Sequence, residues 1–210
     1  MRIALTSIIS LAGMAISACA ADHPYLQAPS TDTYATHNPN GQTILSSGRY
    51  LKPVGRHLPV GREPYGLAMS RDGAPLFVAS EGVGQILTDW REPQPVVMKI
   101  TPPTYLDNQK KEHRTNAGGA DFSPDGRTLF WSGGDSGAVY FYDVISREKI
   151  AEVSLNDEVG GRKFEDSYAV DVKVSADGEY LYCADVTNFR LVVIDVVRRQ
   201  VVGSVPVGRY

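Results

Sequence analysis

A four-residue turn signature recurs three times in this chain and limits what the chain can fold into. Each copy reads Ser-x-Asp-Gly, and the copies begin at Ser70, Ser123 and Ser175, 53 and 52 residues apart. Glycine at the fourth position permits the positive φ that such turns need. A spacing this regular is typical of a repeat protein in which each repeat is one supersecondary unit.

Each repeat arranges four apolar segments around this turn. A first strand runs into the turn, a second leaves it, a third ends in aspartate and a fourth closes the unit. The segments contain the aromatic and β-branched residues that favour strands. They are residues 66–70, 120–123 and 169–175 (first), 76–79, 129–132 and 181–184 (second), 139–143 and 191–195 (third), and 149–153 and 200–205 (fourth). The pattern predicts an all-β chain, a β-propeller made of four-stranded antiparallel blades.

The third repeat resembles a known family. Residues 172–182 read Val-Lys-Val-Ser-Ala-Asp-Gly-Glu-Tyr-Leu-Tyr, Val-Ile-Asp follows at 193–195, and Pro-Val-Gly stands at 206–208. This order resembles the YVTN-type β-propeller repeat, whose Tyr-Val-Thr-Asn position corresponds here to residues 182–185, Tyr-Cys-Ala-Asp. The resemblance extends from about residue 59 to the end and implies a parent of about seven blades. Similar propellers include lactonase-like proteins, and others continue into a phosphoesterase-like domain.

The number of repeats predicts an open ring. Three units follow an N-terminal strand pair at residues 43–45 and 50–52, which predicts about three to four blades. Closed propellers have roughly four to eight. Pro-Val-Gly-Arg occurs at residues 59–62 and again at 206–209, where a further repeat is expected to begin. An open stack exposes apolar sheet faces, so the expectation is that the natural protein continues or that the chain self-associates.

The N-terminus has the pattern of an export signal. Arg2 precedes an uncharged apolar run over residues 3–16, shorter than the roughly 20 residues of a membrane-spanning helix. Residues 16–19, Ile-Ser-Ala-Cys, resemble the bacterial lipobox, so removal of residues 1–18 and lipidation of Cys19 are predicted. The alternative is an ordinary signal peptide cut near residues 18–21. Residues 19–41 are interpreted as a flexible spacer and 42–210 as the propeller, in the periplasm or at the outer membrane.

Charge and cysteine content restrict the partners. The net charge of −3 and the pI of about 5.8 lack the basic excess of a nucleic-acid binder. Cys19 and Cys183 are the only cysteines, so lipidation or removal of the first leaves the second without a disulfide partner. Cys183 lies in an apolar strand and is expected to be a buried thiol. The expected partners are a membrane, through the lipid, and a protein or small molecule at one propeller face.

Loops at one end of the blades are the predicted ligand site, because successive loops of a blade emerge at opposite ends. The candidate ligand-binding residues at this end are Arg62, Glu81, Asn116, Asp135, Asp166 and Asp185. Residues 93–117 and 156–167 are interpreted as long polar loops that either bind a partner or are simply solvated. Three of the carboxylates offer the oxygen ligands that calcium prefers. Acidic loop residues are more often solvated, and neither a metal nor a cofactor is predicted.

No catalytic residue is predicted. Gly134-Asp135-Ser136-Gly137 matches the nucleophile string of chymotrypsin-like proteases, but it falls in a bend between two blade strands. The four histidines are scattered, and neither a phosphate-binding glycine loop nor a haem-attachment motif occurs. Trp131 and the aromatic residues at 140–142 are expected to pack between blades.

The predicted function is a binding or scaffold module in the cell envelope. The first alternative is the N-terminal propeller of a larger enzyme, lactonase-like or fused to a phosphoesterase-like hydrolase. The second is a degraded reading frame. Propellers host unrelated activities, so the fold does not choose among these.

Overall fold

The computed structural model describes residues 29–30, 33–38, 41–52, 54–80, 83–102, 104–107, 109–114 and 118–208. No helix among them is long and apolar enough to cross a membrane. The predicted signal peptide, Cys19 and two of the candidate site residues, Glu81 and Asn116, lie outside the described residues. The chain divides into two units, Met1–Arg56 and His57–Tyr210.

The described part of the first unit contains an antiparallel hairpin. It pairs β1 (Thr43–Ile44) with β2 (Tyr50–Leu51), and Ile44 also bridges to Thr36. Gly48 in the turn has a φ of 73°, which glycine adopts without steric penalty. The predicted N-terminal strand pair is confirmed.

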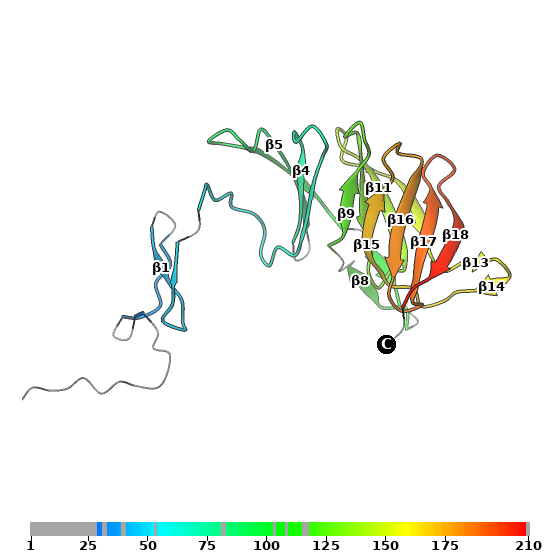
Figure 1. Cartoon of the computed structure of the whole chain (residues 1–210), viewed down its shortest axis with the longest axis horizontal. Helices are drawn as coiled ribbons and strands as arrows, with labels where there is room; N and C mark the ends of the chain where they lie inside the picture. Colours follow the sequence, from blue (N-terminus) through cyan, green and yellow to red (C-terminus); the bar gives the residue numbers. More distant parts are fainter. Residues whose placement is uncertain are drawn as a thin grey trace, which may run out of the picture. The chain divides into compact units, whose positions relative to one another are not determined.

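The second unit is built from four-stranded antiparallel sheets, each with its strands in chain order (Figure 1). Blade 1 comprises β3 (Gly66–Met69), β4 (Leu76–Ser80), β5 (Val83–Thr88) and β6 (Val96–Ile100). Blade 2 comprises β9 (Ala120–Phe122), β10 (Thr128–Ser132), β11 (Ala138–Asp143) and β12 (Lys149–Ser154). Blade 3 comprises β15 (Ala169–Val174), β16 (Tyr180–Asp185), β17 (Arg190–Asp195) and β18 (Gln200–Pro206). The prediction of all-β, four-stranded blades is confirmed.

The Ser-x-Asp-Gly turns join the first strand of each blade to the second. In all three, the serine hydroxyl donates to the carboxylate two residues on at 2.5–2.6 Å, and the glycine φ is 70–83°. The pairs are Ser70–Asp72, Ser123–Asp125 and Ser175–Asp177. These hydrogen bonds hold the pKa of each turn aspartate below its usual value. The turns are structural, as their sequence indicates.

The hydrophobic core lies between neighbouring blades, because successive side chains of a strand point to opposite faces of a sheet. In blade 2, Trp131 and Tyr140 join the cluster shared with blade 1, and Phe130 and Phe141 join the cluster shared with blade 3. All four are at most 2% exposed. The aromatic residues of blade 2 therefore pack between blades, as predicted.

The connections between blades contain more structure than predicted. Residues 93–117 include β6 and a hairpin, and residues 156–167 include a second hairpin. The hairpins pair β7 (Thr104–Leu106) with β8 (Glu112–Arg114), and β13 (Glu158–Val159) with β14 (Arg162–Lys163). The interpretation as loops was wrong for these strands. The two hairpins are short and polar, so they lack the apolar alternation that predicts a strand. β6 is apolar, but it fell within the bounds given to the loop.

Successive blades meet along their first strands. β3 contacts β9 and β9 contacts β15, whereas β3 and β15 share no comparable contact among the described residues. A Cβ atom on Gly66 would collide with the carbonyl of Gly118, so these two backbones approach as closely as only glycine allows. The blades described here leave the ring open.

Candidate functional site

The described candidate residues do not gather into one site. Arg62 and Asp166 are exposed in the loops before blades 1 and 3, and Asp135 is exposed in the turn between β10 and β11. Asp185, at the end of β16, is 1% exposed. Within the described part of the chain, no group of three His, Cys, Asp or Glu side chains is placed to hold a metal ion.

Asp135 attaches a hairpin to blade 2. The hydroxyl of Tyr105, on β7, donates to its carboxylate, and burial together with the charge of Asp135 raises the pKa of Tyr105. On the same hairpin, Asp107 and the Nε2 atom of His113 lie 2.8 Å apart, and the rings of Tyr105 and His113 stack with centroids 5.5 Å apart. The carboxylate of Asp135 thus has a structural use in the fold.

Asp185 forms a buried ion pair with Arg190, the first residue of β17. The Nε atom of Arg190 donates to Asp185 Oδ2 at 2.8 Å, and Nη2 donates to the Leu155 carbonyl and to Ser167 Oγ. Asp185 also accepts a hydrogen bond from the side chain of Asn188. Burial by itself raises the pKa of Asp185, but the hydrogen bonds outweigh it, so the pKa lies below its usual value.

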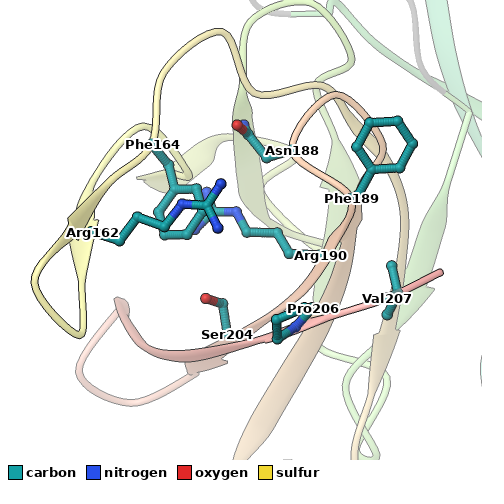
Figure 2. Close-up of a pocket in the computed structure, with 8 residues that line it drawn as sticks. All are labelled: Arg162, Phe164, Asn188, Phe189, Arg190, Ser204, Pro206 and Val207. Atoms are coloured by element: carbon teal, nitrogen blue, oxygen red, sulfur yellow. The ribbon is translucent and has the colours of Figure 1, made fainter. Parts of the chain in front are cut away.

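Arg190 also lines a cavity of about 230 Å³ (Figure 2). The guanidinium carbon of Arg190 lies 3.6 Å from the centroid of the Phe164 ring, and that of Arg162 lies 4.9 Å from the same centroid. Figure 2 shows these three side chains together on one side of the cavity, with Phe189 and Val207 on the other. The full lining is Arg162, Phe164, Asn188, Phe189, Arg190, Ser204, Pro206 and Val207, two arginines with no acidic residue.

Arg190 is paired with Asp185, but one of its N–H groups and the whole charge of Arg162 are left without partners among the described residues. The Nη1 atom of Arg190 is buried and has no hydrogen-bond partner among the described residues. A buried donor without an acceptor costs roughly 1–3 kcal/mol. Arg162 is exposed and forms no ion pair with any residue that the structure describes. The arrangement favours an anion.

Phe189 lines the cavity with a backbone conformation that bulky residues rarely adopt. Its φ is 49°, whereas the equivalent turn of blade 2 places Gly137 at 61°. The two positions correspond because their carbonyls accept matching hydrogen bonds, Gly137 from the Leu155 N–H and Phe189 from the Val207 N–H. Strain of this kind costs on the order of 1–3 kcal/mol and is concentrated at functional sites. The chain thus has an aromatic residue at a position whose φ glycine adopts without strain.

The residues of this cavity were not predicted as a site, although Arg162 and Phe164 lie in the loop over residues 156–167 that was interpreted as a possible partner-binding loop. A signal existed for Arg190, because it alternates with the fully buried Val192 and Ile194 and therefore occupies an inward position of its strand. Phe164 is the one apolar residue in a charged run over residues 162–166. No local pattern indicates that Phe189 lines the same cavity, because that depends on how the segment after the β13–β14 hairpin lies beside blade 3.

A second cavity, of about 340 Å³, lies where the first strands of the three blades begin. Glycine and alanine backbone form much of its wall, and Asp171 is its only charged residue. It is lined by Tyr65, Gly66, Leu67, Gly118, Gly119, Ala120, Val170 and Asp171. It offers fewer groups for recognition than the arginine-lined cavity.

Comparison with known proteins supports the fold. No protein-family model matches the chain, and no curated protein matches it significantly. Among solved structures, 584 chains match. Hydrazine synthase from Kuenenia stuttgartiensis is 21% identical with a TM-score of 0.55, covering 76% of this chain and 40% of its own. The WD40 repeats of RRP9 are 14% identical with a TM-score of 0.52, covering 70% of this chain and 39% of their own.

These likenesses show a β-propeller fold, since WD40 repeats are propeller blades. The chain spans about two fifths of the length of both solved chains. The resemblance to the YVTN-type repeat stays a prediction.

Proposed function

We propose that this propeller is a binding module whose ligand is a small organic anion held in the arginine-lined cavity. The observation that carries the proposal is Phe189, which lines the same cavity as two guanidinium groups with a φ of 49°, where the equivalent position of blade 2 is glycine. Backbone strain persists where the surrounding structure enforces it, and ligand sites are a common reason.

The lining groups favour a carboxylate joined to an apolar body. A guanidinium presents its N–H groups in a planar fork that matches carboxylate geometry, and such charge-assisted hydrogen bonds are the stronger ones. Phe189 and Val207 are 40% and 50% exposed, so an apolar body covering them would remove their surface from water. A cavity of about 230 Å³ suits a ligand of roughly the size of an amino-acid side chain with its carboxylate.

Calorimetry with 3-phenylpropionate tests this proposal, with the neutral 3-phenylpropionamide as the matched control ligand. We expect the acid to bind and the amide to bind about tenfold more weakly, because the amide lacks the charge that pairs with Arg162. Arg162→Gln should reduce the affinity for the acid to that of the amide. Arg127→Gln is the control variant, because Arg127 lies in the turn between β9 and β10, away from the cavity lining.

Phe189→Gly separates ligand binding from stability. We expect it to weaken binding of 3-phenylpropionate while changing the free energy of unfolding by less than about 1 kcal/mol, because glycine relieves the strained φ as the ring contacts are lost. Equal binding of acid and amide, or binding unaffected by both cavity variants, would refute the proposed ligand class. Loss of several kcal/mol of stability on Phe189→Gly would show that the ring serves the fold.

We also propose that the protein is exported and anchored by a lipid on Cys19, on the strength of the apolar N-terminal run and the residues 16–19. Cys19→Ser should move the protein from the membrane fraction to the soluble fraction of the cell envelope and abolish labelling with a radioactive fatty acid. Unlabelled wild-type protein in the soluble fraction would instead support an ordinary signal peptide.

A further inference from the structure

The two guanidinium groups of the arginine-lined cavity differ in what they lack. Arg190 is 2% exposed, and its charge is balanced by the carboxylate of Asp185, whose Oδ2 atom lies 2.8 Å from the Nε atom. Arg162 is exposed and forms no ion pair with any residue that the structure describes. The lining contains no acidic residue. The positive charge that remains to be balanced is therefore that of Arg162.

Arg190 lacks a hydrogen-bond acceptor rather than a counter-ion. Its Nε atom donates to Asp185, and its Nη2 atom donates to the Leu155 carbonyl and to Ser167 Oγ. Its Nη1 atom is buried and has no acceptor in the described part of the chain. A second carboxylate here would place two negative charges on one guanidinium, whereas a neutral carbonyl oxygen accepts from Nη1 without adding charge. The cavity thus calls for one anion and one neutral acceptor.

Both arginines lie against the same aromatic ring, so a single small molecule can reach both. The guanidinium carbons of Arg190 and Arg162 are 3.6 and 4.9 Å from the centroid of the Phe164 ring. Figure 2 shows the three side chains together on one side of the cavity. The anion and the neutral acceptor therefore belong on neighbouring parts of one ligand.

Phe164 covers the buried guanidinium, and the segment that carries it is weakly held. The ring is 7% exposed and lies against the face of Arg190. The preceding β13–β14 hairpin consists of two residue pairs, and nothing lies within 4 Å of a Cβ built on Gly160 or Gly161 at its tip. A hairpin this short has little stability of its own. A ligand that displaces the ring would reach Nη1.

We infer that the ligand of this cavity is an N-acylated apolar amino acid, whose carboxylate pairs with Arg162 and whose acyl carbonyl accepts from Arg190 Nη1. Its apolar side chain covers Phe189 and Val207 on the other side of the cavity. Ser204 supplies a hydroxyl that can accept the amide N–H. A cavity of about 230 Å³ admits one such residue. This inference rests on the proposed function and names the second group that its ligand carries.

Calorimetry with N-acetylphenylalanine tests the inference, using the full chain with Cys19→Ser to prevent acylation. The matched control ligand is 2-benzylpentanoate, which keeps the carboxylate and the benzyl group but has a propyl chain in place of the acetylamino group. We expect N-acetylphenylalanine to bind about tenfold more tightly, because its carbonyl accepts from a charged donor that otherwise has no acceptor.

A variant of Arg190 locates the carbonyl. Arg190→Lys should abolish the difference between the two ligands, because lysine keeps a positive charge beside Asp185 but has no second terminal nitrogen. Arg127→Gln, in the turn between β9 and β10, should keep the difference. Circular dichroism checks that Arg190→Lys stays folded. If it does not, the comparison of ligands in the parent protein decides the matter.

The ligand series separates this inference from the proposed function. Binding of 3-phenylpropionate together with equal affinities for N-acetylphenylalanine and 2-benzylpentanoate would overturn the inference alone. Tightest binding by benzylsuccinate, which has a second carboxylate, would also overturn it, because Arg190 would then take an anion. Tighter binding by a peptide that ends in phenylalanine would replace the small ligand by a peptide terminus. Absence of binding by every member of the series would overturn the proposed function as well.

Discussion

The guanidinium carbon of Arg190 lies 3.6 Å from the centroid of the Phe164 ring. Arg190 begins β17 of blade 3, whereas Phe164 directly follows the β13–β14 hairpin that leads out of blade 2. The same guanidinium donates to the Leu155 carbonyl, next to the last strand of blade 2. One buried arginine thus joins a blade, the preceding blade and the hairpin between them, and it forms part of the cavity.

The stability lost by replacing Arg190 should be partly recovered when its partner Asp185 is replaced as well. Arg190→Met leaves the carboxylate of Asp185 buried without its counter-ion, which should lower the free energy of unfolding by about 3–5 kcal/mol. The double variant with Asp185→Asn should recover part of this loss, because no unpaired charge remains. Urea unfolding followed by tryptophan fluorescence measures both. Equal losses in the single and double variants would contradict the pairing as the source of the effect.

Stability should decline in acid, and Asp185 should account for part of the decline. Its folded-state pKa is lowered, so its contribution is complete above the unfolded-state pKa of about 4 and is lost as the pH falls below that value. Urea unfolding between about pH 6 and pH 2.5 should therefore show a falling free energy, with a shallower slope in Asp185→Asn. The turn aspartates act in the same direction, so a residual slope is expected. An unchanged slope in the variant would contradict the assignment.

A methyl group on Gly66 should destabilise the protein, whereas one on Gly203 should not. The Cβ of Gly66→Ala would meet the backbone of Gly118, which cannot move without separating the first strands of blades 1 and 2. We expect a loss of at least about 2 kcal/mol on thermal unfolding, in the range of core overpacking. Nothing lies within 4 Å of a Cβ on Gly203, so Gly203→Ala is the control. Similar melting temperatures for both variants would show that the blades do not approach as described.

The thiol of Cys183 should be inert in the folded protein. Cys183 is 0% exposed, and burial raises the pKa of its thiol, so the reactive thiolate is scarce at neutral pH. Ellman's reagent should detect no fast-reacting thiol from Cys183 in native Cys19→Ser protein and one thiol per chain in guanidinium chloride. Rapid reaction in the native state would mean that β16 opens far more readily than a core strand should.

The sequence predicts some residues near the candidate site, but it does not predict the cavity itself. Two of the predicted site residues, Asp166 and Asp185, lie close in sequence to the cavity residues Phe164, Asn188 and Arg190. The cavity itself was missed, because its wall comes from the β14 hairpin, the turn before β17 and the end of β18. The local signals were Arg190, a charged residue at an inward strand position, and Phe164, an apolar residue in a charged run.

The sequence by itself determined the repeat, the order of strands in each blade, the turns and the aromatic core between blades. These depend on neighbouring residues, since alternation and turn chemistry act over a few positions. Only the tertiary structure decided that Asp185 and Arg190 are buried as a pair beside Phe164 and that Phe189 is strained. The pair is buried by Leu155 and Phe164, and the backbone of Phe189 is held by Val207, so both features depend on segments that the local pattern does not include.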